Sequence, residues 1–169
     1  VQGDKSGDLP LSAKLKNYLK KKHVKKGNVF LGVPHRLDRP VSGVVLFART
    51  SKALERLALL FREGRVTKKY WAMVQERPPR DSDTLVHYLT RNSEQNKSYA
   101  SDTPRLGARE ARLNYRLLAS LDRYHLLEVE LHTGRHHQIR AQLAAIGCPV
   151  KGDLKYGAQC LEAAKRCFA

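Results

Sequence analysis

The sequence predicts an α+β fold, because helical and strand patterns share one chain of 169 residues and the clearest strands alternate strictly between apolar and polar side chains. The alternation over residues 111–117 and 127–132 indicates a sheet with one face in water, as in antiparallel or mixed sheets. Two helical patterns, over residues 11–26 and 51–63, precede these strands. Counting all alternating and buried apolar runs indicates about six or seven strands, which is compatible with a largely antiparallel sheet flanked by helices.

The first helical pattern, over residues 11–26, is amphipathic and basic. Apolar residues recur at helical spacing from Leu11 to Leu19, lysines occupy most of the other side, and Gly27 is expected to end the helix. The apolar stripe is expected to pack on the sheet. The pattern leaves two interpretations of the lysines equally open, namely a solvated face or a surface that contacts phosphate groups.

A charged loop lies between two predicted strands. Asn28–Val33 and the uninterrupted apolar run Val44–Ala48 each predict a buried strand, the second one buried on both faces. Pro34 and Pro40 fix φ in the loop, and Pro40 disfavours a helical conformation at the residue before it. Asp38 therefore occupies a stiff segment between two arginines. A surface cluster of salt bridges is the commoner role for such a charged segment. Later stretches of the chain favour a functional role for it instead.

The next elements are a helix and a strand. Ser51 is expected to cap a helix that runs to about Glu63. Residues 66–74 then predict a strand in which Tyr70 and Trp71 point to opposite faces of the sheet. A tyrosine in a strand is usually a core or sheet-edge residue, so the pattern alone gives Tyr70 no functional role.

The remaining elements surround a long polar segment. A strand over residues 84–90 is followed by the polar residues 91–109, which predict either a long hairpin that touches a substrate or a mobile loop. After the two alternating strands, a final helix is expected from about His137 to Ile146, closed by Gly147.

The charge balance indicates an anionic partner. The chain has 32 lysine and arginine residues against 16 aspartate and glutamate residues, a formal net charge of +16, and a pI near 10.1. Nucleic acid is the expected partner for such a chain. A membrane span needs about 20 apolar residues, far more than any run here, and the polar first ten residues predict no secretory signal.

The cysteines and histidines predict neither a disulfide framework nor a metal site. Three cysteines, Cys148, Cys160 and Cys167, cannot all pair and lack metal-finger spacing, which favours ordinary thiols in a reducing cytoplasm. Histidines cluster at residues 132–137, but no cysteine or carboxylate accompanies them at ligand spacing. We therefore expect no metal and no cofactor.

Three motifs resemble one family, the RluA-type RNA pseudouridine synthases. HRLDRPVSG at 35–43 resembles the family's loop H-R-L-D-R-x-T-S-G, with Val41 in place of the usual threonine. VTKKYWAMV at 66–74 is like its K-K-x-Y-x-A strand. HTGRHHQIRAQLAAIGCPVKGDLKYG at 132–157 is similar to T-G-R-T-H-Q-I-R-x-H-L-x-x-x-G-H-P-I-x-G-D-x-x-Y-G. The resemblance covers nearly all of residues 1–157.

The resemblance implies isomerisation of uridines in ribosomal or transfer RNA to pseudouridine. Asp38 matches the catalytic carboxylate, Arg140 the arginine that keeps it ionised, and Tyr70 the active-site tyrosine that serves in removing the carbon-5 proton. Arg36 matches the arginine that fills the space of a base flipped out of its stack. The further residues expected to bind substrate are His35, Arg39, Arg135 and His137.

The resemblance also implies the architecture and the limits of the chain. We expect one catalytic domain over residues 1–169, with a mixed, largely antiparallel sheet, flanking helices and a basic cleft crossing its centre. Compared with the family, the chain lacks an upstream strand with a Lys-Pro motif and a downstream strand near a Leu-His-Ala motif, so we expect a domain truncated at both ends. A cytoplasmic monomer is expected.

Two other classes of function stay open. A non-catalytic RNA or ribosome binder could use the same scaffold, although binding needs neither an aligned carboxylate nor a negative charge facing phosphates. A hydrolase could use Asp38 with His35 or His137, but it would commonly need a second carboxylate or a metal. Asp153 is a candidate for that second carboxylate, and a turn residue after Gly152 is the stronger interpretation of it.

Overall fold

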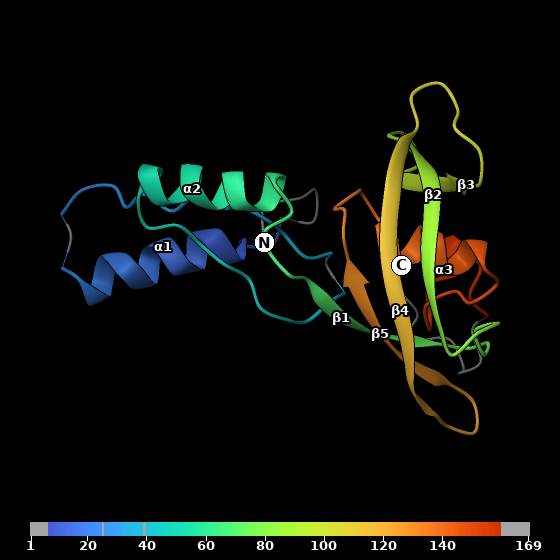
Figure 1. The fold of residues 1–169 in the computed structure, drawn as a ribbon. Helices are drawn as coiled ribbons and strands as arrows, with labels where there is room; N and C mark the ends of the chain where they lie inside the picture. The colour runs from blue at the N-terminus through green and yellow to red at the C-terminus, as the bar shows by residue number, and fades with distance from the viewer. Residues whose placement is uncertain (1–6, 25, 39, 160–169) are drawn as a thin grey trace. The chain divides into compact units, whose positions relative to one another are not determined.

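The computed structural model describes residues 7–24, 26–38 and 40–159. It divides into two compact units, Val1–Val66 and Thr67–Ala169. The described residues form helices and an antiparallel sheet, which confirms the α+β prediction (Figure 1). In chain order the elements are α1 (Leu11–Lys22), α2 (Ser51–Arg62), β1 (Lys69–Val74), β2 (Ser82–Asn92), β3 (Lys97–Ser101), β4 (Arg109–Ser120), β5 (His125–Leu131), α3 (Gln138–Ala145) and the short 3-10 helix η1 (Leu154–Tyr156).

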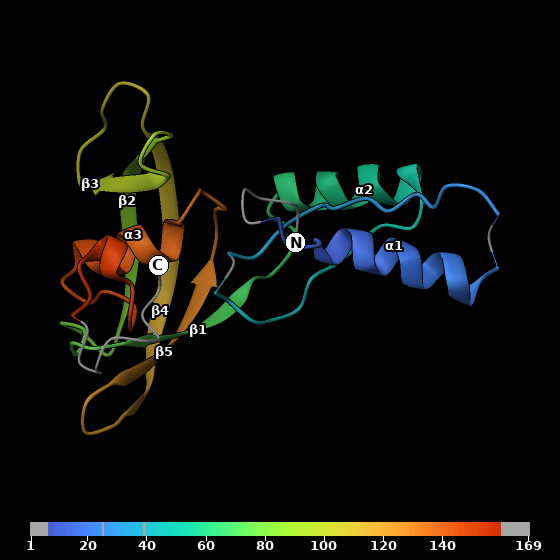
Figure 2. The ribbon, with the colours of Figure 1, turned by 180° about the vertical axis from the view of Figure 1, so that it is seen from behind.

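The second unit is a five-stranded sheet with a helix on one face. The strand order is β1-β5-β4-β2-β3, and every pair of neighbours is antiparallel. Figures 1 and 2 show α3 lying across one face of this sheet. The described residues thus contain five named strands, fewer than the six or seven expected, because two predicted strands of the first unit do not form.

The alternating strands put their apolar side chains under α3, as predicted. Leu113 and Tyr115 of β4 and Leu127 and Val129 of β5 are buried, and Leu143 of α3 packs against them. The intervening residues of β4 face the other side of the sheet. Cys148 closes this core as a buried thiol whose pKa is raised by burial and, to a smaller extent, by Glu76; Cys160 and Cys167 lie outside the described residues.

The end of α1 and the N-cap of α2 each differ slightly from the predicted residue. Helix α1 stops at Lys22 rather than continuing to residue 26, because Val24 already has a left-handed φ of 47° that a helix cannot continue. Helix α2 is capped by Thr50 and not by Ser51, since the Thr50 hydroxyl accepts a hydrogen bond from the Ala53 N–H at 3.1 Å. Both helices are otherwise where their periodicity predicts.

The apolar run Val44–Ala48 is not a strand buried on both faces, so that prediction is wrong. Its only described pairing is a single antiparallel bridge between Ala48 and Gly32, with N···O distances of 2.8 and 2.9 Å. Val44 is 81 % exposed and Leu46 is 42 % exposed. An apolar run buries both faces only where neighbouring strands and layers cover it, and one bridge does not supply that cover.

Gly32 is required by the close approach of α2. A Cβ at this position would lie 2.8 Å from Leu54 Cδ2 and 3.0 Å from Leu54 Cβ. We therefore expect Gly32→Ala to destabilise the first unit by about 1–3 kcal/mol, since the bridge or the helix must shift. Amide hydrogen exchange at Ala48, which donates to the Gly32 carbonyl, measures this loss.

A glycine without such a neighbour is the matched control. Gly27 has no atom within 4 Å of an added Cβ, so Gly27→Ala should change stability by less than about 0.5 kcal/mol. Equal protection of the Ala48 amide in the Gly32→Ala variant and the unmutated protein would contradict the packing argument.

The polar segment 91–109 forms the hairpin that was one of its two predicted conformations. Strand β3 pairs with β2 from Asn92↔Lys97 to Tyr88↔Ser101. The turn between the strands is closed by Asn92, whose Oδ1 accepts from the Gln95 N–H, and by Asn96 in a left-handed conformation. Residues 102–108, between β3 and β4, form no strand, and the contact of the hairpin with a substrate stays a prediction.

No helix in the described ranges is long and apolar enough to cross a membrane. The single catalytic domain, the cytoplasmic location and the monomeric state stay predictions.

Candidate functional site

Asp38 lies half-buried on a turn of the first unit. The turn is closed by a hydrogen bond from the Val41 N–H to the Asp38 carbonyl at 3.1 Å. Arg36, expected to enter the space of a flipped base, is exposed. Arg39 lies outside the described residues. A carboxylate on a turn that contains Pro40 has the stiff setting that the sequence predicted.

His35 holds the same loop against α2. Its Nε2 accepts a hydrogen bond from the Leu46 N–H at 2.9 Å, and its ring stacks on Phe61 with centroids 4.9 Å apart. Burial lowers the pKa of His35, so the neutral ring that this hydrogen bond needs is favoured. These contacts give His35 a structural task in addition to the predicted contact with substrate.

Gln138 builds the turn that leads into α3. Its Oε1 accepts from the Thr133 hydroxyl at 2.8 Å and from the Arg135 N–H at 2.9 Å, and its Nε2 donates to the Arg112 carbonyl of β4 at 3.1 Å. Because Gln138 is only 3 % exposed, these bonds form away from competing water. The turn places His137 in a left-handed conformation, with φ of 50°, directly before the helix.

Arg140 is held in place from three directions. Its Nε and Nη2 donate to the two carboxylate oxygens of Asp153 at 2.6 and 2.8 Å. Its Nη1 lies 3.1 Å from His137 Nε2, and its Cζ lies 4.9 Å from the centre of the Tyr156 ring. Together, the contacts with Asp153, His137 and Tyr156 restrict both the position and the rotation of the guanidinium.

The bond to Arg140 also determines the tautomer of His137. A guanidinium can only donate, so His137 Nε2 must be the acceptor and Nδ1 must carry the proton. Nδ1 then donates to the Tyr156 hydroxyl, which lies 3.1 Å away and also accepts from the Ser98 N–H at 2.8 Å. The structure therefore brings the predicted residues His137 and Arg140 together through Tyr156.

The β2–β3 hairpin supports this cluster through Ser98, which is 2 % exposed. The Ser98 hydroxyl lies 2.9 Å from His136 Nδ1 and 2.8 Å from the His136 carbonyl oxygen, and Asn96 Oδ1 lies 3.1 Å from His136 Nε2. The rings of His136 and His137 stack with centroids 3.8 Å apart. Hairpin and helix motif thus form one hydrogen-bonded assembly in the second unit.

Tyr70 and Arg135 are the other two predicted site residues described in the second unit. Tyr70 of β1 is half-buried and packs on the core beneath α3, whereas Trp71 is 76 % exposed on the opposite face, as the alternation predicts. Lys68 precedes β1 and donates to the Thr133 carbonyl at 3.3 Å; burial lowers its pKa. Arg135 is exposed and donates from Nε to the Glu110 carbonyl at 2.9 Å.

A buried His–Gln pair lies between α3 and the sheet. The Gln142 side chain is 0 % exposed, and its Nε2 lies 3.1 Å from His87 Nδ1, from the Leu85 carbonyl and from the Ala111 carbonyl. Burial lowers the pKa of His87, and the nearby Asp102 opposes that shift. His87 is therefore favoured in its neutral form in the folded protein.

This arrangement predicts a loss of stability in acid. The pKa of His87 in the folded protein lies below its unfolded value of about 6.5. Neutral His87 therefore contributes fully to the free energy of unfolding above about pH 6.5, and this contribution falls as the pH drops toward the folded pKa. We expect the free energy of unfolding, measured in urea, to fall between pH 7.5 and 5.0. The fall should be smaller in His87→Gln, which keeps an acceptor for Gln142; an equal fall would contradict the assignment.

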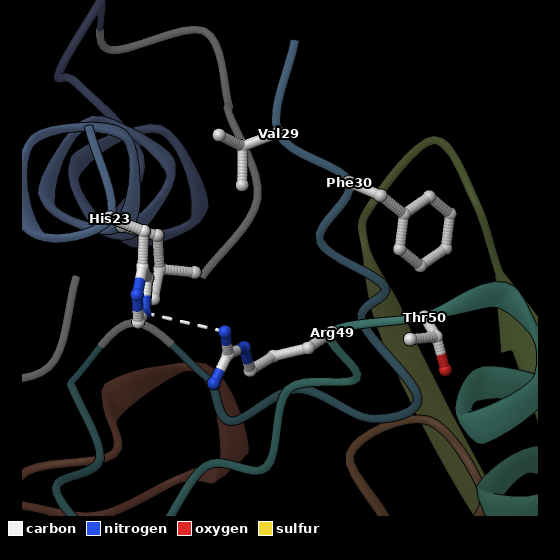
Figure 3. Close-up of a pocket in the computed structure, with 6 residues that line it drawn as sticks. His23, Val29, Phe30, Arg49 and Thr50 are labelled. Carbon is white, nitrogen blue, oxygen red and sulfur yellow. Dashed lines mark hydrogen bonds between the residues drawn. The ribbon is translucent and has the colours of Figure 1, made fainter. Parts of the chain in front are cut away.

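The described pocket of the first unit holds none of the predicted site residues. It has a volume of about 320 Å³ and is lined by Leu19, His23, Val29, Phe30, Arg49 and Thr50. Figure 3 shows the His23 ring directed toward Arg49, with Nε2 and Nη2 3.3 Å apart. Within the described ranges no group of three His, Cys, Asp or Glu side chains could hold a metal ion.

Sequence reasoning missed the role of Asp153, Tyr156 and Ser98. Asp153 was assigned to a turn, and it does lie directly before η1, but its carboxylate is buried and paired with Arg140. A carboxylate with 0 % exposure cannot reach a substrate, which counts against Asp153 as the second acid of a hydrolase. The signal that was available is its place inside the third motif, thirteen positions after Arg140.

The comparisons with known proteins agree on one family. A family model described as RNA pseudouridylate synthase matches residues 2–145. The chain is 39 % identical over 131 residues to an uncharacterized RNA pseudouridine synthase of Chloroflexus aurantiacus, covering 78 % of this chain and 40 % of that protein. It is 32 % identical over 126 residues to ribosomal large subunit pseudouridine synthase D of Borreliella burgdorferi, covering 75 % and 38 %.

A solved structure has the same fold. Human RNA pseudouridylate synthase domain containing 4 superposes with a TM-score of 0.75 at 28 % identity, over 89 % of this chain and 60 % of that one. The chain spans about 40 % of the length of the curated relatives named above.

Proposed function

Because this chain belongs to the RNA pseudouridylate synthase family, we propose that it converts specific uridines in structured RNA to pseudouridine. The match over residues 2–145 carries this proposal, since the matched region contains the three residues proposed for catalysis, Asp38, Tyr70 and Arg140. The formal net charge of +16 supports a polyanionic substrate. The predicted resemblance to the RluA-type synthases is confirmed by the family match.

The reaction determines what Asp38 has to do. The bond between ribose and the ring nitrogen breaks, the freed uracil turns, a bond forms from ribose to ring carbon-5, and the proton on carbon-5 leaves. Asp38 is proposed as the ionised carboxylate that acts as a nucleophile or promotes cleavage of the glycosidic bond. Arg140 is proposed to keep it ionised, because an adjacent guanidinium favours the charged form and offers a planar pair of donors.

Access to the base assigns roles to further residues. A uridine within folded RNA must leave its stack before it can react, and Arg36 is proposed to occupy the vacated space. Its exposed position on the Asp38 loop supports that role. Contacts with substrate are proposed for His35, Arg39, Arg135 and His137, and contacts with phosphate groups for the lysines of α1, which include the three in its last turn.

Release of tritium from RNA labelled at uracil carbon-5 tests the proposal. The full-length protein is incubated with ribosomal and transfer RNA transcribed without modifications, and released tritium is compared with pseudouridine in the digested product. The name of the Borreliella burgdorferi relative makes ribosomal RNA the first pool to test. Release from either pool supports the enzyme, whereas RNA binding without release from both pools supports a binding protein on the same scaffold.

Replacement of Tyr70 by phenylalanine separates the last step from the earlier ones. The ring keeps its packing on the core, but the hydroxyl proposed to serve in removing the carbon-5 proton is lost. We expect tritium release to fall by about 10²–10⁴-fold with RNA affinity unchanged within a few-fold. Pseudouridine formation at the unmutated rate would rule out this role for Tyr70.

A further inference from the structure

Asp153 makes two of the contacts that hold the guanidinium of Arg140. Asp153 accepts two of the five N–H donors of Arg140, through Nε and Nη2, and its side chain is 0 % exposed while that of Arg140 is 16 % exposed. His137 accepts from a third donor at Nη1. A charged pair this far from water is stable only with near-ideal geometry, so the guanidinium has little freedom to rotate.

Asp153 is itself held by the backbone around it. Its N–H donates to the Val150 carbonyl at 3.0 Å, and its carbonyl accepts from the N–H groups of Tyr156 and Ala158 at 3.0 and 3.1 Å. The guanidinium of Arg140 lies over the ring of Tyr156, which these bonds fix. One short segment therefore supplies both the carboxylate that pairs with Arg140 and the ring that its guanidinium lies over.

We propose that Asp153 is a positioning residue of the reaction, which holds the guanidinium of Arg140 in the orientation in which it acts. This inference rests on the proposed catalytic role of Arg140. Asp153 has no exposed surface and cannot touch RNA, so its effect on catalysis runs entirely through Arg140. Side-on binding by Asp153 engages one edge of the planar guanidinium, so that loss of its charge leaves the group freer to turn.

The kinetics of Asp153→Asn test this role. The amide keeps the size of the side chain but loses the charge and one acceptor, so Arg140 is no longer fixed. We expect kcat for tritium release to fall at least ten-fold, with KM for RNA changed less than three-fold.

A merely structural role gives a different result. Loss of folded protein lowers the number of active sites, measured by titration with tightly bound RNA, but leaves kcat per site unchanged. An unchanged kcat per site overturns the proposal. Asp81→Asn, which breaks the exposed ion pair with Arg77 at 2.9 Å in the same unit, is the matched control and should change neither quantity.

Two additions keep the test decisive. If Asp153→Asn does not fold at the assay temperature, Asp153→Glu is measured; it keeps the charge but displaces the carboxylate, and an unchanged kcat would overturn the proposal. Independently of turnover, ¹⁵N NMR should show slow rotation of the Arg140 guanidinium in the unmutated protein and fast rotation in the Asp153 variant. The Arg140 signals are assigned by their loss in Arg140→Lys. Equal rotation in both overturns the proposal, whereas absence of turnover on every RNA overturns the proposed function alone.

Discussion

Replacing Asp38 by asparagine is expected to abolish tritium release, with turnover below a thousandth of the unmutated rate, while RNA affinity stays within a few-fold. The amide has the shape of the carboxylate but lacks the negative charge that either route of glycosidic cleavage requires. Because removing a carboxylate also removes repulsion from phosphate groups, tighter binding with no turnover would equally fit the prediction.

The control for this variant is another aspartate of the same charge. Asp81→Asn removes one negative charge at an exposed site, so it reports how much of any change in RNA affinity comes from net charge alone. Retained turnover in Asp38→Asn would remove the proposed mechanism. Loss of RNA binding together with turnover would make Asp38 a binding residue.

Replacing Arg140 by methionine is expected to lower the free energy of unfolding by about 3–5 kcal/mol, because Asp153 is then left buried and unpaired. The double replacement Arg140→Met with Asp153→Leu should recover most of that loss, since two apolar side chains can fill the site. Neither variant should turn over RNA. Urea unfolding measures the stability and tritium release the activity.

The exposed pair of Arg77 and Asp81 calibrates this double-mutant cycle. Its side chains are 60 % and 72 % exposed, so the coupling between them should be no more than about 1 kcal/mol. If the Arg140–Asp153 coupling is equally small, the pair is not the rigid support that its burial indicates. If the double variant regains turnover as well as stability, Arg140 has no catalytic part.

The function of the histidines in the third motif follows from their partners rather than from their number. His136 bonds to the β2–β3 hairpin and His137 links Arg140 to Tyr156. The sequence predicted no metal site at these histidines, because no cysteine or carboxylate accompanies them at ligand spacing. Their contacts place both in the hydrogen-bonded assembly that supports Arg140.

The sequence by itself determined the features that depend on neighbours along the chain. Period-two alternation located β4 and β5 and assigned Trp71 to the face opposite Tyr70, because successive side chains of a strand point to opposite faces. Helical periodicity located α1, α2 and α3 within a few residues. The motifs that contain Asp38, Tyr70 and Arg140 predicted the family, which the comparisons confirm.

Only the tertiary structure decided which distant groups meet. The partner of Arg140 is a buried aspartate after a turn, the support of His136 comes from a serine thirty-eight positions earlier, and Val44 and Leu46 of the predicted buried strand stay exposed. Local patterns record which side chains are apolar and where a chain can turn. They do not record which strand, helix or carboxylate covers a given face, because burial and ion pairing depend on how segments far apart in the sequence pack together.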